Sequence, residues 1–314
     1  MFPGAWTERE LAQFRILTFV LSLKFILAVL ENLAFDSIAW VFILLGLLAL
    51  IGGRSALAGA SLAVAAALKV TPLIFLSYLL FKRRFTSAAV FAIVVIFLTL
   101  LPDVLLPPKQ SWHAAIWVRE VLLGPFLPDP GNTFQFWISD GPMNQSLRAA
   151  IARIIRAGDR SEEYEVAIRV MGSQGFATAV RVVTSLYVLG VGFLMLKSRP
   201  HDRLIAVEGS LLAISALVLS PVSSQSHFVT LMLPYAILAA ALIKDRATRT
   251  TNAAVLLTSF MLATATSNDL VGRSFTGWAL WHSLPVLGTL VLIIQLGVLI
   301  WSVSARQGEL RSTF

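Results

Sequence analysis

Apolar residues fall into long blocks along this chain, separated by short polar or basic turns. Blocks rich in Leu, Ile, Val, Ala and Phe cover 11–30, 37–52, 86–102, 176–196, 204–220, 227–243, 253–270 and 284–303. A helix needs about 20 residues to cross the hydrocarbon core of a bilayer, and several blocks approach that length. The pattern therefore predicts an all-α, polytopic membrane protein.

Residues 55–81 are also apolar, but their flanks conflict with a single crossing. Arg54 precedes the block and Lys82, Arg83 and Arg84 follow it. Basic residues at membrane borders are typical of the cytoplasmic side, so both ends belong on one face. We expect two short helices that turn at 69–72, where Pro72 removes a backbone donor. This brings the total to about ten transmembrane or half-membrane helices.

The remaining basic clusters, at 197–203, 244–249 and 306–311, indicate the orientation. They alternate with loops of little net charge, which places the clusters and the C-terminus in the cytoplasm. The outer side then holds the segments 31–36, 103–175, 220–227 and 267–282. We expect a single integral membrane domain over 1–314 in the cell membrane.

The segment 103–175 is the longest of the outer connections. It is rich in proline and contains Trp112, Trp117 and Trp137, together with a predicted helix over 145–157. This mixture favours a folded extracytoplasmic cap over a flexible linker.

Composition narrows the class of protein further. Hydrophobic residues make up 57% of the 314 residues and charged residues 13%, against about 25% charged in an average soluble domain. The net charge of +8 lies in the membrane-flanking clusters, so no nucleic-acid partner is expected. The chain has no cysteine, and its four histidines show no metal-ligand spacing. We therefore expect neither a metal nor a cofactor.

Lys69 is the first candidate for a binding role, because it lies between two apolar arms. An ammonium group there is costly unless it reaches the interface or meets an anion. A lipid phosphate is a suitable anion. The alternative is a lysine that snorkels at a helix end or caps the carbonyls of the turn.

Asn144, Gln145 and Ser146 open a predicted helix that also carries Arg148, Arg153 and Arg156. Free backbone N–H groups beside an arginine form a site for an anion or a sugar hydroxyl. Two other interpretations remain open. The stretch is an ordinary helix cap with basic residues at the headgroup surface, or an Asn-x-Ser sequence of the glycosylation type.

The turn from Ser220 to His227 is unusually polar for its length and includes Gln225. His227 can act as a general acid or base, or donate to a phosphate. A capping turn with an interfacial histidine is the alternative. Other polar residues in exposed or costly places are the outer acids Asp36, Asp103, Asp129, Asp140 and Asp269, and the cations Arg15, Lys24 and Arg181 within apolar blocks.

Three of these stretches together resemble glycosyltransferase family 87. They are the small-residue helix and Lys-x-x-Pro turn at 56–73 with its basic exit at 82–84, the Asn-Gln-Ser stretch at 144–146, and the Ser-Pro-x-Ser segment at 220–223 that leads to His227. Their order and spacing match across about residues 30–245.

The resemblance implies a GT-C architecture with an active site on the extracytoplasmic face. It also implies transfer of a sugar, expected to be mannose, from a polyprenyl-phosphate donor to a lipid or glycan acceptor. Lys69, Arg148 and His227 then become candidate phosphate or donor contacts. Asn144 and Gln145 shape the cavity, and Ser146 and Gln225 complete the predicted substrate-binding set.

One departure from the family concerns the catalytic acid. Family members usually begin with an additional span and a first outer loop that bears this acid, and we expect the present chain to start after both. Asp36 is the candidate substitute, with His227 as the second catalytic candidate. A truncated or noncatalytic GT-C-like membrane partner is the first alternative, and a transporter is the second.

Overall fold

The computed structural model describes residues 5–106, 111–123, 140–155, 173–198, 204–264 and 266–312, without the side chains of 173 and 306–312. Within these ranges the fold is entirely helical. The long helices are α1 (Glu8–Glu31), α2 (Asp36–Ile51), α3 (Ser55–Leu68), α5 (Phe85–Leu105), α9 (Ser173–Lys197), α10 (Ile205–Leu219), α11 (Met232–Lys244), α12 (Arg249–Thr264) and α15 (Leu284–Ser312).

Shorter elements connect or extend these helices. They are η1 (Thr71–Leu73), α4 (Ile74–Phe81), α6 (His113–Ile116), η2 (Trp117–Leu123), α8 (Leu147–Ile155), η5 (Gln225–Leu231), α13 (Asn268–Val271) and α14 (Arg273–Trp281). Five described segments are long and apolar enough to cross a membrane: Glu8–Glu31, Phe85–Leu105, Gln174–Lys197, Gln225–Lys244 and Leu284–Ala305. The prediction of an all-α polytopic membrane protein is confirmed.

Contacts divide the chain into two compact units. Unit 1 comprises Met1–Ala34 and Asp140–Phe314, and unit 2 comprises Phe35–Ser139. Much of the predicted cap lies outside the described residues, including Trp137, Asp129 and Arg156. The single membrane domain and the cap at 103–175 therefore stay predictions.

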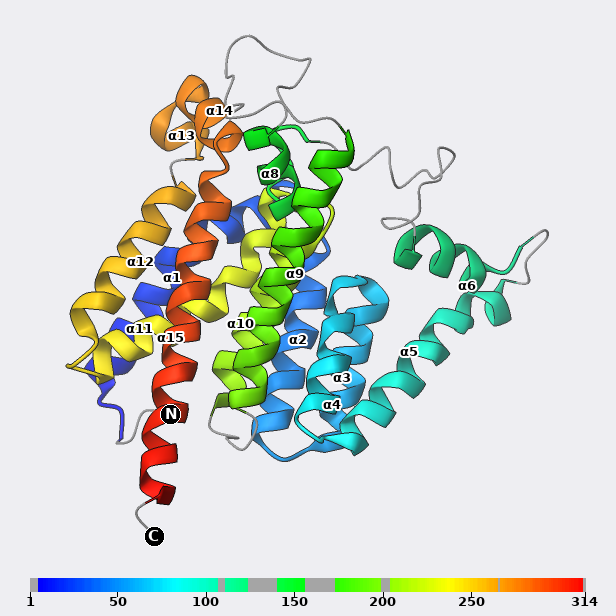
Figure 1. Ribbon diagram of the computed structural model, residues 1–314, viewed down its shortest axis with the longest axis horizontal. Coiled ribbons are helices and arrows are strands. Elements are labelled where there is room, and N and C mark those ends of the chain that lie inside the picture. The colour runs from blue at the N-terminus through cyan, green and yellow to red at the C-terminus, as the bar shows by residue number, and fades with distance from the viewer. Residues whose placement is uncertain are drawn as a thin grey trace. The chain divides into compact units, whose positions relative to one another are not determined.

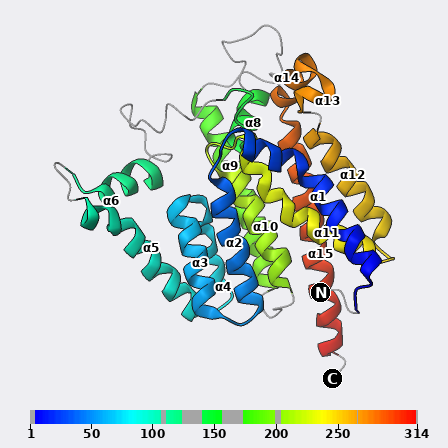
Figure 2. The ribbon, with the colours of Figure 1, turned by 180° about the vertical axis from the view of Figure 1, so that it is seen from behind.

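Close helix packing in unit 2 depends on two glycines. A Cβ atom on Gly46 of α2 would lie 2.5 Å from Cγ of Leu62 in α3. A Cβ atom on Gly59 of α3 would overlap the Ser87 carbonyl oxygen and lie 3.1 Å from the Phe91 nitrogen in α5. Figure 2 shows α3 between α2 and α5, so α3 contacts both helices. Without side chains at these positions, the three backbones approach closely.

The same contacts confirm the predicted turn at 69–72. Gly59 and Ser87 each lie within the first turns of their helices, so α3 and α5 begin at the same end of unit 2. The intervening chain therefore returns to the end from which it started. Helix α3 stops because Lys69 is extended (φ −150°, ψ 124°), and Pro72 then enters the short helix η1.

Unit 1 is organised around α10, where nearly every side chain from Val207 to Val218 is buried. Helices α9, α10 and α15 run side by side (Figure 1). Helix α1 packs against η5 and α11, and the rings of Phe25 and Phe228 stack at 5.7 Å between centroids. In Figure 1, α10 runs toward the end of the unit at which α15 begins, so the starts of these two helices lie at opposite ends of unit 1.

Helix α12 ends earlier than the apolar block 253–270 predicts. It stops at Thr264, and α13 begins at Asn268. Lys24, one of the cations within an apolar block, donates to the Ala263 carbonyl and to the Thr266 hydroxyl. The ammonium group thus donates to one carbonyl and one hydroxyl at the C-terminal end of α12, where a cation is favourable. This contact accounts for a lysine inside a predicted span.

Candidate functional site

Lys69 and Asp36, two of the candidates from sequence, form an ion pair. The Lys69 Nζ atom lies 2.5 Å from Oδ1 of Asp36, and their side chains are 25% and 10% exposed. Asp36 is the first residue of α2, where a carboxylate is favourable, and Lys69 follows the last residue of α3. Because α2 and α3 are antiparallel, this start and this end adjoin. The chain thereby places a cation and a carboxylate together at one end of unit 2.

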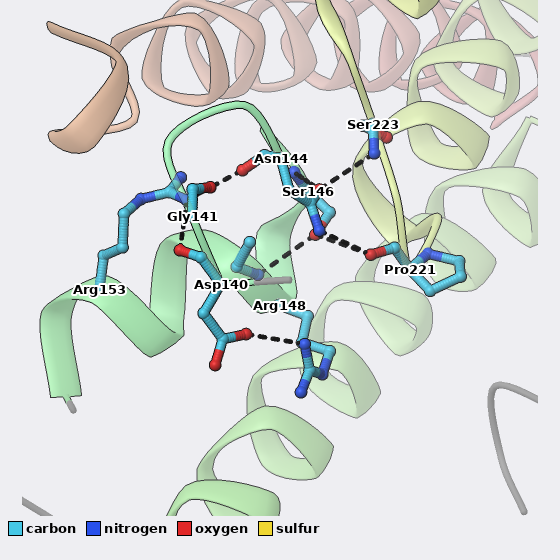
Figure 3. Close-up of polar contacts among 9 residues, drawn as sticks. Asp140, Gly141, Asn144, Ser146, Arg148, Arg153, Pro221 and Ser223 are labelled. Atoms are coloured by element: carbon cyan, nitrogen blue, oxygen red, sulfur yellow. Dashed lines mark hydrogen bonds and ion pairs between the residues drawn. The ribbon is translucent and has the colours of Figure 1, made fainter. Parts of the chain in front are cut away.

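Asn144 joins two stretches that stood apart in the sequence, as Figure 3 shows. Its Nδ2 donates to the Pro221 carbonyl at 2.9 Å, and its Oδ1 accepts from the backbone of Ser223 at 3.0 Å and of Ser146 at 3.1 Å. The backbone N–H of Gln145 also donates a hydrogen bond to the Ser223 carbonyl at 2.7 Å. The Asn-Gln-Ser stretch and the Ser-Pro-x-Ser turn therefore form one hydrogen-bonded cluster, which we call the Asn144 cluster.

The side chains of Gln145 and Ser146 are fully buried. Gln145 Nε2 donates to the carbonyls of Pro142 (2.6 Å) and Leu280 (2.7 Å), while its Oε1 accepts no hydrogen bond from the residues described. Ser146 Oγ accepts from the Ala149 amide at 3.2 Å, as an N-cap of α8 does. The cap interpretation of Ser146 is thus confirmed, and Gln145 braces the cluster.

The two arginines of α8 have different environments. Arg148 Nη1 lies 2.8 Å from Oδ1 of Asp140, and its guanidinium stands 5.4 Å from the centre of the Phe176 ring. Its side chain remains 33% exposed. Arg148 is therefore paired at the edge of the Asn144 cluster.

Arg153 is buried beneath the same cluster. Its guanidinium donates to the carbonyls of Asp140, Gly141 and Asn144 at 2.8–3.1 Å and to Oγ of Ser283 at 2.6 Å. Burial lowers the pKa of Arg153 to about 10, so the group stays cationic at neutral pH. The sequence pattern places Arg153 on the helix but not in this role, because its partners come from distant segments.

His227 and Gln225 lie in η5, both half-buried. The Ser224 backbone N–H donates to Nδ1 of His227 at 3.2 Å. A ring nitrogen that accepts has no proton, so the neutral His227 ring carries its proton on Nε2. This tautomer is suited to donating a hydrogen bond to a phosphate oxygen.

Asp103 and His113 form a second polar pair in unit 2, which the sequence pattern does not reveal. The buried Asp103 carboxylate accepts from the His113 amide (2.5 Å), the Ala114 amide (2.9 Å) and Nδ1 of His113 (3.0 Å). Since a carboxylate only accepts, Nδ1 carries the proton and Nε2 of the neutral ring has a lone pair. The His113 side chain is 45% exposed. This tautomer is suited to accepting a proton, opposite to that of His227.

The fold and these clusters define a polytopic helical membrane protein whose polar groups gather where helices end. The sequence model of glycosyltransferase family 87 matches residues 4–221. The chain therefore belongs to glycosyltransferase family 87 and is a membrane glycosyltransferase. Comparison with curated protein sequences and with solved structures found no match.

The extent of the family match bears on the candidate residues. It includes Asp36, Lys69 and the Asn144 stretch, and it ends at Pro221. His227 and Gln225 lie beyond that end. Among the described residues, no three His, Asp or Glu side chains converge as a metal site requires.

Proposed function

We propose that this chain transfers mannose from a polyprenyl-phosphate donor to a lipid or glycan acceptor on the extracytoplasmic face of the cell membrane. Membership of the family supports the reaction class. The observation that carries the proposal is the ion pair between Lys69 and Asp36, which offers a cation for the phosphate and a carboxylate for the acceptor proton.

The chemistry requires both groups. The acceptor hydroxyl loses its proton to a base, its oxygen forms a bond to the anomeric carbon, and the bond from that carbon to the phosphate oxygen breaks. Polyprenyl phosphate leaves with more negative charge than it had in the donor. A cation aimed at the phosphate therefore stabilises the transition state more than the bound donor. Lys69 supplies this cation and Asp36 is the candidate base.

The ion pair also suggests an order of events. While no donor is bound, Asp36 holds the Lys69 ammonium near the end of α3 and offsets the cost of its burial. An incoming phosphate competes for the ammonium, which frees the carboxylate to accept a proton. The donor thus activates the base as it binds.

The positions of the basic residues support the proposed orientation. Lys244 at the end of α11 lies 2.7 Å from Glu10 at the start of α1. These ends and the basic segment after α9 are assigned to the cytoplasm by the excess of Lys and Arg there. Asp36, Lys69 and the Asn144 stretch then belong to the outer side.

A noncatalytic partner is the second candidate function, and the Asn144 cluster favours it. The polar atoms of Asn144 bond to Pro221, Ser223 and Ser146, so they act as scaffold in this structure. A chain that only binds a lipid-linked glycan needs the scaffold and the phosphate contact but no base.

The two functions differ in how they respond to loss of Asp36. Purified protein in membrane vesicles is supplied with radiolabelled polyprenyl-phosphate-mannose, and both donor retention and transfer are measured. For a transferase, Asp36→Asn retains the donor and loses transfer, whereas Lys69→Met loses both. Lys82→Met, at the opposite end of the hairpin, is the matched control and keeps both. Retention without transfer by the unaltered protein would establish the noncatalytic partner instead.

A further inference from the structure

An apolar groove runs along unit 1 between α9, α10 and α15. Its volume is about 450 Å³. The walls include Leu186, Gly190 and Leu194 of α9, Leu211 of α10, and Ile294 and Trp301 of α15. Helices α9 and α15 are both long and apolar enough to cross the membrane, so the groove follows the direction of the hydrocarbon chains.

The groove opens away from the core of unit 1. Leu186 and Ile294 are 65% and 66% exposed, although they are apolar and lie in membrane-spanning helices. A Cβ atom on Gly190 would meet nothing within 4 Å. A surface of this kind contacts hydrocarbon rather than water in a bilayer. The shape therefore fits one flexible hydrocarbon chain.

A cation marks one end of the groove. The Lys197 Nζ atom lies 2.9 Å from the centre of the Trp301 ring, and the Phe193 ring lies 6.1 Å from Trp301. Tryptophan and the last lysine of a span are typical of the headgroup level. A headgroup phosphate at this end would meet the Lys197 ammonium, which makes an anionic lipid complementary to the groove.

Lys197 lies far from the Asn144 cluster along α9. The start of α9 is next to the Asn144 cluster, because Phe176 packs with Leu147. Lys197 is the last residue of the same helix, about 30 Å away along the axis. A phosphate held there is at the opposite end of unit 1 from the cluster.

We propose that this groove binds one chain of an anionic phospholipid whose headgroup phosphate contacts Lys197. The bound lipid contacts α9, α10 and α15, which together line the groove. This binding does not depend on the proposed sugar transfer.

Two glycines of α9 provide a matched test. Gly190 lines the groove and Gly192 does not, yet a Cβ atom on either meets nothing within 4 Å. Gly190→Leu fills the groove, whereas Gly192→Leu adds the same side chain to the same helix outside it. Each protein is delipidated in detergent, incubated with equal amounts of dioleoylphosphatidylglycerol, dioleoylphosphatidylcholine and polyprenyl phosphate, and analysed by native mass spectrometry.

The expected result is one retained phosphatidylglycerol per chain in the unaltered protein and in Gly192→Leu. Retention falls at least about tenfold in Gly190→Leu, since its side chain takes the space of several methylene groups. Lys197→Gln removes the preference for phosphatidylglycerol over phosphatidylcholine. Equal retention of phosphatidylglycerol by the two leucine variants would overturn the proposal, and so would preferential retention of phosphatidylcholine over phosphatidylglycerol by the unaltered protein. Polyprenyl phosphate bound at Lys69 is unaffected by either leucine, so a loss of polyprenyl phosphate rather than phosphatidylglycerol in Gly190→Leu would also overturn the proposal.

Discussion

The Oδ1 atom of Asn144 accepts a hydrogen bond from the backbone of Ser223 at 3.0 Å, across 79 residues of sequence. The same side chain also contacts Ser146 and Pro221. Its amide group therefore fixes the start of α8 against the turn after α10. The Asn144 side chain alone therefore contacts three residues of the cluster, two of them distant in sequence.

Asn144→Ala should lower the free energy of unfolding by about 2–4 kcal/mol, because buried backbone groups lose their hydrogen-bond partners. Asn32→Ala is the matched control. Asn32 is exposed, and among the residues described its side chain bonds only to the Ala28 carbonyl of the preceding helix, so its loss should cost less than about 0.5 kcal/mol. Thermal unfolding of both variants in detergent measures the difference. Equal losses would show that the Asn144 cluster is not a stabilising contact.

Arg153→Lys should destabilise the protein by about 2 kcal/mol or more, although the charge is kept. A lysine cannot supply the planar set of donors that reaches three carbonyls and Ser283. Arg148→Lys, on the same helix but partly exposed, should cost less than about 1 kcal/mol. Chemical denaturation in a fixed detergent compares the two. A larger loss at Arg148 would contradict the buried role of Arg153.

The ion pair of Lys69 and Asp36 should show a coupling energy of about 1 kcal/mol or more in a double-mutant cycle. Asp36→Asn or Lys69→Met alone removes one member of this largely buried ion pair, whereas the double variant removes both charges. Stability of the four proteins is compared under one condition. Additive losses would mean that the two residues act independently.

His113 and His227 should differ in which ring nitrogen carries the proton. Nitrogen NMR of labelled protein at about pH 8, where an ordinary imidazole is neutral, should find the proton on Nδ1 of His113 and on Nε2 of His227. Asp103→Asn should remove the preference in His113 and leave His227 unchanged, since Asp103 contacts only the former. The same tautomer on both rings would contradict the proposed roles, in which His113 accepts a proton and His227 donates a hydrogen bond to a phosphate.

The helices were predictable because the length of an apolar block is a property of consecutive residues. Even the hairpin at 69–72 follows from the chain alone, since Arg54 and Arg84 must share one face. The contact at the end of α12 was not predictable from hydropathy, because its cation, Lys24, belongs to a helix that is distant in sequence.

The candidate site was predictable only in part, for a related reason. Lys69 and Asn144 are conspicuous because polar groups are rare beside apolar blocks. Their partners depend on how the helices fold together. The partners of Arg153 and the pairing of Asp103 with His113 have no local signature. Ser283 is 130 residues from Arg153, and Asp103 and His113 belong to different helices.

Transfer of labelled mannose by the purified protein in vesicles tests the central claim most directly. The account predicts that the label moves from polyprenyl-phosphate-mannose to a lipid or glycan product in vesicles that contain the protein, and not in vesicles without it. Mannose supplied on a nucleotide should not be transferred. Transfer from the nucleotide sugar, or no transfer above protein-free vesicles with either donor, would contradict the account.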